Sequence, residues 1–355
     1  MGELVVRQGL SADWDRLAMP RAPTLSTRWI KLVENRYDGP MQTFALLDDG
    51  QMAIAMCGAV LGEPGANRRM DPYRILVGEA VGDGLLTNGP HPWLGRAIGE
   101  VYPCLHLMFP NYETAPVGSL TRDADTTRTF LDLLVEYARA RDLRSVVATY
   151  LRPDCTTLLD VMRGAGWLVA PMTDRCDLEV GWTDFDGYLA SLQSKRRIAV
   201  QRELRDLEEK QVELTERRLE ADEPEIVALR CQLTQKYGGH ADPAKETALL
   251  ARVRKFFDPK DLLVFEARRR ERLHGFTMFV RDDAHWTAFL TGTDYTNPAA
   301  QLSYFATCFY QPAARAPRVG VEAIAYGFGA WQAKRLRGCR LRPVHIAVRR
   351  IEESA

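Results

Sequence analysis

Two stretches of the chain show the same order of expected secondary structure. Apolar residues at helical spacing over 130–143 precede a β-branched run ending at Tyr150, and an apolar stretch over 303–314 precedes a similar run ending at Tyr326. The two expected strands end 176 residues apart, close to half of the 355-residue length. This recurrence predicts an internal duplication, and therefore two similar domains.

Runs suited to antiparallel strands occur earlier in each half. In the first half, two such runs flank the turn Asp48-Asp49-Gly50, which favours a hairpin. In the second half, three runs over 262–291 predict a three-stranded meander. Antiparallel strands followed by a helix and a further strand are typical of the α+β class. We expect two domains, 1–180 and 181–355, each with a mixed, mostly antiparallel sheet flanked by helices.

The composition excludes several classes of protein. Hydrophobic residues make up 46% and charged residues 26%, as in a folded globular chain rather than a disordered or collagen-like one. No apolar run approaches the roughly 20 residues of a membrane helix, and the N-terminal residues lack a signal-peptide pattern, so a cytoplasmic location is expected. The seven cysteines are scattered without a CxxC pair, which predicts reduced thiols and no metal site.

The net charge is zero, but two segments are strongly basic. The first, 194–205, lies near the start of a helix expected to run from 184 to 210. Cations are disfavoured at the positive end of a helix dipole, so a compensating anion is expected there. The candidates to bind donor phosphates are Lys195, Arg196, Arg197 and Arg202. The alternative is a solvated helix face on which these cations pair with Glu203, Asp206 and Glu208.

The second basic segment, 331–350, contains no acidic residue. Lys334 and Arg337 share one face of a predicted helix, and Gly327 and Gly329 just before it permit a close backbone approach by a ligand. This arrangement indicates a site for a phosphate or a developing oxyanion. The alternative is a surface helix whose basic residues complement the dipole and whose C-terminal cap is Gly338.

Three runs resemble a known family in their residues and in their order. Residues 188–204 carry a Ser-Lys-Arg-Arg helix start, 263–279 a central hairpin, and 326–338 a glycine, lysine and Arg-Gly pattern. Over about residues 180–345 the chain resembles the Fem-type tandem acyltransferases of the GNAT fold, a family of peptidoglycan biosynthesis. The resemblance implies two GNAT-like domains and an acyltransferase that forms an amide by direct attack of an amine on an activated ester. It implies no covalent enzyme intermediate and no tightly bound cofactor.

The expected donor follows from a departure from ordinary acetyl-CoA-dependent GNAT enzymes. Their glycine-rich turn, whose amides cradle the CoA pyrophosphate, is missing here, because 291–300 has one glycine and a proline. Fem-type members that use charged tRNA also lack this turn. The resemblance therefore implies aminoacyl-tRNA as donor and an amine acceptor, either a cell-wall precursor or a specialised metabolite. The alternatives are an acyl-CoA donor held by a non-standard loop and a non-catalytic polyanion-binding protein.

The remaining candidate residues serve catalysis and the acceptor. Asp294 follows a predicted strand and is the candidate base, with Lys334 as the second catalytic residue, because acyl transfer to an amine needs proton removal and oxyanion stabilisation. The alternative is that Asp294 only forms a turn. The candidate acceptor pocket consists of Tyr112, Glu113, Tyr295 and Tyr326.

Overall fold

The computed structural model describes residues 2–18, 23–34, 39–77, 97–109, 111–297 and 300–352. The chain divides into two compact units. Unit 1 comprises Met1–Asp174 together with Arg342–Ala355, and unit 2 comprises Arg175–Leu341. The sequence analysis expected a boundary near residue 180, with all later residues in the second domain. The structure places the division between residues 174 and 175 and returns the C-terminal residues to unit 1.

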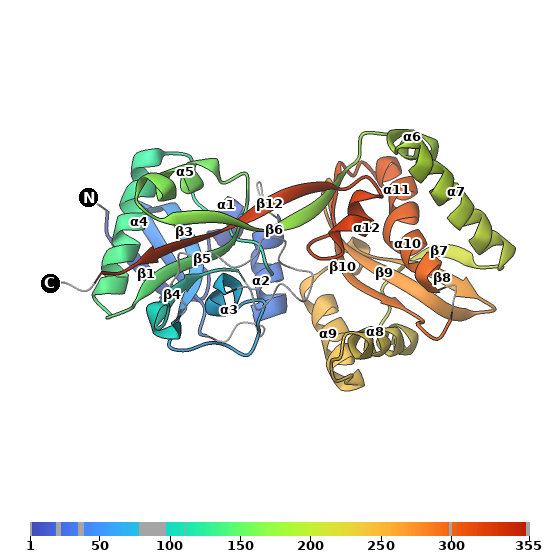
Figure 1. The fold of residues 1–355 in the computed structure, drawn as a ribbon, viewed down its shortest axis with the longest axis horizontal. Helices are drawn as coiled ribbons and strands as arrows, with labels where there is room; N and C mark the ends of the chain where they lie inside the picture. The colour runs from blue at the N-terminus through green and yellow to red at the C-terminus, as the bar shows by residue number, and fades with distance from the viewer. Residues whose placement is uncertain are drawn as a thin grey trace. The chain divides into compact units, whose positions relative to one another are not determined.

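Unit 1 is built on a mixed sheet (Figure 1). Its strand order is β1-β2-β3-β4-β5-β12, in which only β4 and β5 run parallel to each other. The predicted hairpin is formed by β2 and β3, with Asp49 and Gly50 at positive φ in its turn. The strands are β1 (Leu4–Gln8), β2 (Gln42–Asp48), β3 (Gln51–Leu61), β4 (Cys104–Leu107), β5 (Ser145–Leu151) and β12 (Arg340–Arg350).

Helices cover both faces of the unit 1 sheet. Side chains alternate along its strands, so successive residues pack with helices on opposite faces. Ile54 and Met56 of β3 pack with α4 (Ala124–Arg139) and α5 (Thr156–Gly164), whereas Ala55 and Cys57 pack with the segments near the N-terminus. Those segments are α1 (Trp14–Ala18), η1 (Pro23–Leu25) and α2 (Thr27–Val33); the short helices α3 (Pro72–Leu76) and η4 (Ile98–Glu100) complete the unit.

Unit 2 repeats this plan. Its strand order is β6-β11-β10-β9-β8-β7, with β10 and β11 parallel and the other pairs antiparallel. The predicted meander is formed by β8, β9 and β10. The strands are β6 (Leu168–Glu179), β7 (Glu213–Arg218), β8 (Leu262–Arg269), β9 (Arg272–Asp282), β10 (His285–Thr293) and β11 (Ala323–Ala325).

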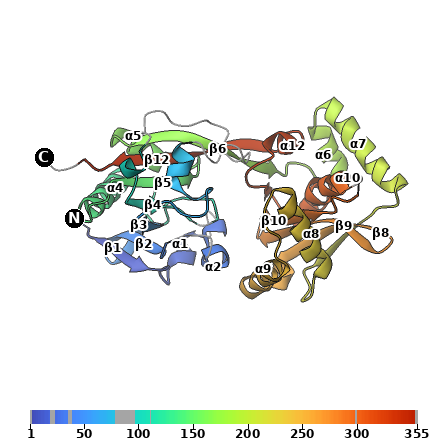
Figure 2. The same ribbon diagram turned by 60° about the horizontal axis from the view of Figure 1, so that its bottom comes forward.

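The helices of unit 2 also lie on two faces of its sheet. One face carries α6 (Phe185–Ser191), α7 (Ser194–Glu209), α10 (Ala300–Phe305), the π-helical turn η6 (Ala306–Tyr310) and α11 (Gln311–Arg315). On the other, α8 (Pro224–Lys236) packs on β10 and α9 (Pro243–Phe256) on α8 (Figure 2). The turns η5 (Pro259–Asp261) and η7 (Ala316–Val319) and the short α12 (Trp331–Arg335) complete the unit. The helix expected over 184–210 is two helices, because Leu192 adopts an extended conformation.

The two units share one order of elements. In each, a parallel strand pair is connected by helix and followed by a further helix and a long strand: β4, α4, β5, α5, β6 in the first half and β10, α10–α11, β11, α12, β12 in the second. Residues 345–350 of β12 pair with β5 and residues 177–179 of β6 pair with β11, so each long strand completes the sheet of the other unit. The predicted α+β class with two GNAT-like units is confirmed. Within the described residues, no helix is long and apolar enough to cross a bilayer.

Candidate functional site

The carboxyl ends of the parallel strands are the first place to look for a site, because ligands of sheets with parallel strands bind where such strands end. Each unit has one parallel pair. In unit 2, the segment leaving β11 is the loop 326–330, which precedes α12. In unit 1, the segment leaving β5 is 152–155, which precedes α5. The predicted site residues follow β10 and β11 in unit 2 and β4 in unit 1, or lie in the first turns of α7.

Lys334 anchors the loop 326–330. Its side chain is only 6% exposed, and Nζ donates to the carbonyl oxygens of Tyr326 at 2.6 Å and Phe328 at 2.8 Å. Gly327 and Gly329 adopt φ of +63° and +73°, the left-handed region that favours glycine. Burial lowers the pKa of Lys334. The ammonium group is thus committed to the shape of the loop.

Arg337 connects α12 to α7 and to the π-helical turn. Its Nη2 lies 3.3 Å from Oε2 of Glu203, its Nε donates to the Tyr310 hydroxyl at 3.2 Å, and its guanidinium stacks 3.3 Å above the Phe305 ring. The side chain is buried. Arg337 therefore has its charge matched inside unit 2 by Glu203.

Tyr326 lies beside the loop with its ring stacked on Phe309, at a centroid distance of 4.6 Å. Its hydroxyl is buried and makes no hydrogen bond to any described residue. Burial raises the pKa of Tyr326 well above its usual value, so the phenol is neutral. A neutral hydroxyl with an unused proton can donate to an oxygen that gains negative charge.

Asp294 closes a turn just after β10. Its Oδ1 accepts hydrogen bonds from the backbone and hydroxyl of Thr296 at 3.1 and 2.5 Å, and its Oδ2 lies 3.0 Å from Nη2 of Arg272. The turn presents Tyr295, which is 40% exposed and has Lys236 Nζ 3.9 Å from its ring centroid. Asp294 thus has the contacts of a turn former, and its predicted role as base requires one of these contacts to open.

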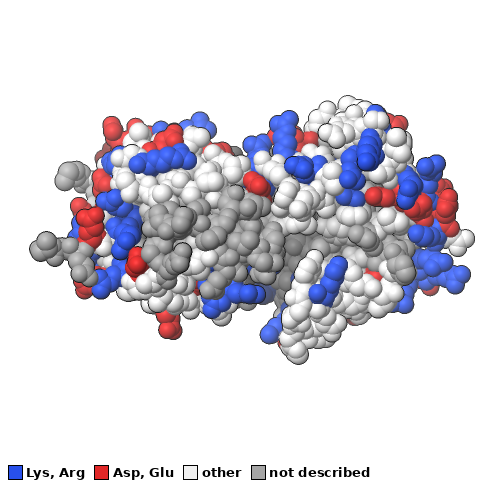
Figure 3. Space-filling model, in the orientation of Figure 1, with Lys and Arg blue, Asp and Glu red and all other residues white. Residues whose placement is uncertain are grey.

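Four cations of α7 have no acidic partner among the residues that the structure describes. Lys195 and Arg202 are exposed, and Arg196 and Arg197 are half-buried. Within the described ranges, none of the four makes an ion pair or a side-chain hydrogen bond, and Glu203 pairs with Arg337 instead. Figure 3 shows Lys and Arg side chains gathered over the region of α7, with Asp and Glu side chains among them. The alternative of a solvated helix face is compatible with these exposed cations, although Glu203 pairs with Arg337 and not with them.

Glu113 and Tyr112 lie in unit 1, in the loop between β4 and α4. Glu113 is buried and accepts hydrogen bonds from Thr24 Oγ1 and Arg152 Nη1, both at 2.5 Å. Tyr112 packs edge-on against Tyr150, with ring centroids 5.3 Å apart. The candidate acceptor residues therefore divide between the units, since Tyr295 and Tyr326 belong to unit 2.

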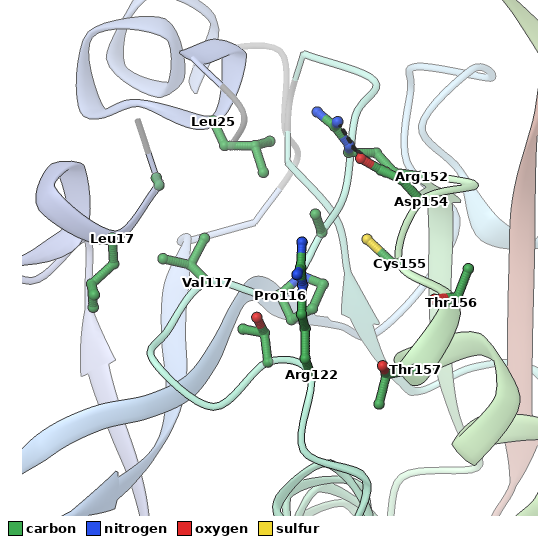
Figure 4. A pocket seen from close by; sticks show the side chains of 13 residues that line it. Leu17, Leu25, Pro116, Val117, Arg122, Arg152, Asp154, Cys155, Thr156 and Thr157 are labelled. Atoms are coloured by element: carbon green, nitrogen blue, oxygen red, sulfur yellow. Dashed lines mark hydrogen bonds and ion pairs between the residues drawn. The ribbon is translucent and has the colours of Figure 1, made fainter. Parts of the chain in front are cut away.

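A cavity of about 520 Å³ opens beside Arg152 in unit 1 (Figure 4). Its walls come from the end of α1, from η1, from the loop preceding α4, and from the turn preceding α5 with the first residues of that helix. Gly118 lets that loop lie on β3, because a Cβ there would come within 2.2 Å of the Ala53 carbonyl oxygen. The sequence analysis did not identify the lining residues Arg122, Arg152, Asp154, Thr156 and Thr157. Their only local signal is a cluster of polar residues after a buried strand.

Among the residues that the structure describes, no group of three or more His, Cys, Asp or Glu side chains is placed to hold a metal ion. The seven thiols, all among the described residues, are buried or half-buried and form no disulfide. Burial raises the pKa of Cys155 to about 12 and that of Cys308 to about 11, so neither is a thiolate at neutral pH.

The fold is that of a tandem α+β protein with two similar units. The sequence profile of the FemAB-like family, described as peptidoglycan biosynthesis/recognition, matches residues 94–351. The chain belongs to the FemAB-like family. This confirms the predicted resemblance, and with it the expected enzyme class, an acyltransferase. No curated protein matches the sequence.

Solved structures of the same fold cover almost the whole chain. FemX has a TM-score of 0.60 at 9% identity, over 97% of this chain and 96% of FemX. A conserved protein of unknown function from Bacteroides thetaiotaomicron has a TM-score of 0.57 at 14% identity, over 98% and 100%. L-PGS from Bacillus licheniformis has a TM-score of 0.52 at 10% identity, over 92% and 88%. At these identities the likeness shows the fold.

Proposed function

We propose that the protein forms an amide by transferring an aminoacyl group from charged tRNA to an amine acceptor, either a cell-wall precursor or a specialised metabolite. The observation that carries this proposal is the set of four cations on α7, Lys195, Arg196, Arg197 and Arg202, which lack partners among the described residues. A cation in the first turn of a helix costs about 0.3–1 kcal/mol through the helix dipole. A bound phosphate backbone offsets this cost.

The loop 326–330 supports the chemical step of the proposal. The attack of an amine on an ester carbonyl places negative charge on the carbonyl oxygen, and catalysis requires donors for it. The candidate donor is the Tyr326 hydroxyl, which is buried in this structure at the start of the loop that Lys334 holds. In this scheme Lys334 is a positioning residue.

Proton removal from the amine is assigned to Asp294, as the sequence analysis predicts. The contact to Arg272 is the one that can open, because the Arg272 side chain is 64% exposed, although the Asp294 side chain is only 2% exposed. Loss of this contact would free Oδ2 while Thr296 still holds Oδ1.

Product analysis by mass spectrometry tests the donor. The purified protein is incubated with amine acceptors and either charged tRNA or an acyl-CoA mixture. We expect an amide only with charged tRNA, and its loss in the variant Lys195→Ala/Arg196→Ala/Arg197→Ala. The control Arg7→Ala/Arg139→Ala, which removes exposed cations of unit 1, should keep full activity. An amide from acyl-CoA alone would contradict the donor assignment, and RNA binding without any product would favour the non-catalytic alternative.

A further inference from the structure

The cavity of unit 1 is independent of the donor site proposed above. All of its lining residues lie in unit 1, whereas α7 and the loop 326–330 lie in unit 2. Its volume of about 520 Å³ falls within the range of about 300–1,000 Å³ typical of small-molecule sites. We therefore consider the cavity as a separate candidate ligand site.

The charges of the cavity wall leave one cation unmatched. Arg152 is neutralised twice: Nη1 lies 2.5 Å from Glu113 Oε1, and Nη2 lies 2.6 Å from Asp154 Oδ2. Arg122, by contrast, is exposed to solvent, makes no ion pair or hydrogen bond through its side chain to any described residue, and reaches into the middle of the cavity in Figure 4. Arg152 and its two carboxylates carry a net charge of −1, so the group that also includes Arg122 is neutral, and Arg122 is the cation of the wall without a partner among the described residues.

A ligand of higher negative charge fits this wall poorly. Asp154 contributes a carboxylate to the wall, and the neighbouring Asp123 caps α4 by accepting from the Thr126 amide at 2.7 Å. These carboxylates disfavour a pyrophosphate or a phosphate dianion nearby. One guanidinium matches one carboxylate, with which it can form two parallel hydrogen bonds.

The rest of the wall is divided by polarity. Leu17, Leu25 and Val117 form an apolar side, and Thr156 and Thr157 place hydroxyl groups across from them (Figure 4). The Cys155 thiol lies on the same side as Thr156 in Figure 4 and is protonated, because burial raises its pKa to about 12. The thiol is therefore a packing surface and not a nucleophile.

We propose that this cavity binds a small organic monocarboxylate with an aliphatic body, whose carboxylate pairs with Arg122 and whose body lies on Leu17, Leu25 and Val117. The binding claim stands on the cavity alone. Under the proposed function, this ligand is the acyl acceptor, an amine that carries such a carboxylate. This second statement rests on the proposed function.

Binding of three probes with the same aliphatic chain tests the proposal without any donor: octanoate, octylamine and octyl phosphate, titrated calorimetrically into the full-length protein. We expect octanoate to bind most tightly. Arg122→Gln should weaken octanoate binding about 10-fold to 100-fold, since a hydrogen bond to a charged group contributes about 1.5–3 kcal/mol. The matched control Arg139→Gln, an exposed arginine on α4, should leave binding unchanged.

A second variant tests the place of the aliphatic body. Thr157→Trp, at a half-buried position in the first turn of α5, adds a ring to the cavity wall and should abolish octanoate binding while Arg122 is intact. Undetectable octanoate binding by the wild type, tighter binding of octylamine or octyl phosphate, or unchanged affinity in Arg122→Gln would each overturn the proposal. If the wild type binds octanoate but does not catalyse aminoacyl transfer, that result would instead count against the proposed function.

Discussion

At the residue scale, Lys334 shows how a buried cation can serve a loop rather than a ligand. Replacing it with methionine removes two hydrogen bonds to backbone carbonyls and leaves those oxygens without their donor. We expect Lys334→Met to lower the free energy of unfolding by about 1–3 kcal/mol. Denaturant unfolding measures the change, with the exposed neighbour Arg335→Met as the control. Equal midpoints for the two variants would contradict the anchoring role.

His106 is a second residue with a testable consequence. It is fully buried in β4 beside Thr149, at 2.9 Å, and burial lowers its pKa to about 3. Between pH 6.5 and pH 3 the unfolded chain binds a proton at this histidine and the folded chain does not, so stability falls as the pH falls. His106→Gln removes this titration. The wild type should lose stability more steeply than the variant between pH 7 and pH 4 in urea unfolding; parallel pH profiles would refute the assignment.

At the element scale, the contact between Arg337 and Glu203 ties α12 to α7. Removing one partner leaves the other charge uncompensated in a largely buried place, which costs about 3–5 kcal/mol in fully buried pairs. Because Glu203 is partly exposed, we expect about 2 kcal/mol for Glu203→Ala. In a double-mutant cycle, Arg337→Met combined with Glu203→Ala should cost less than the sum of the single variants. Additive losses would show that the two side chains are not coupled.

The elements themselves were largely predictable, because their signals are local. The period-2 runs around Asp48-Asp49-Gly50 predicted the β2–β3 hairpin, and the helical spacing over 130–143 predicted α4. The break between α6 and α7 was missed, because nothing in the sequence near Leu192 indicates the extended backbone that ends α6. The cavity was missed as well, since Leu17, Ala18 and Leu25 meet residues of 115–122 and 152–157 only in the tertiary structure. The hydrogen-bond partners of Lys334 Nζ were not predictable either, because they belong to a loop whose path no spacing rule predicts.

At the scale of the whole molecule, the long strand that ends each half of the chain pairs in the sheet of the other unit: β6 in unit 2 and β12 in unit 1. Residues 342–355 belong to unit 1, where β12 pairs with β5. The sequence did not predict this exchange, because a β-branched run does not specify which sheet edge it joins. We expect a chain ending at Leu341 to lose hydrogen-exchange protection in β5, whereas a chain ending at Glu352 should retain it. Unchanged protection of β5 in the shorter chain would mean that β12 is dispensable for unit 1.

The proposed donor makes its own prediction at this scale, because tRNA spans many phosphates while the chain as a whole is neutral. Specific attraction must then come from local charge, and in unit 2 the unpaired cations of α7 provide it. Each phosphate contact contributes about 0.7–0.9 to the slope of log affinity against log salt concentration.

The salt dependence of charged-tRNA binding tests the central claim most directly. Wild type, Lys195→Ala/Arg196→Ala/Arg197→Ala and Arg7→Ala/Arg139→Ala are titrated at a series of salt concentrations. If α7 contacts donor phosphates, the triple variant should bind more weakly and its slope should be smaller by about 2, while the control keeps the wild-type slope. Identical slopes for all three proteins would contradict the account.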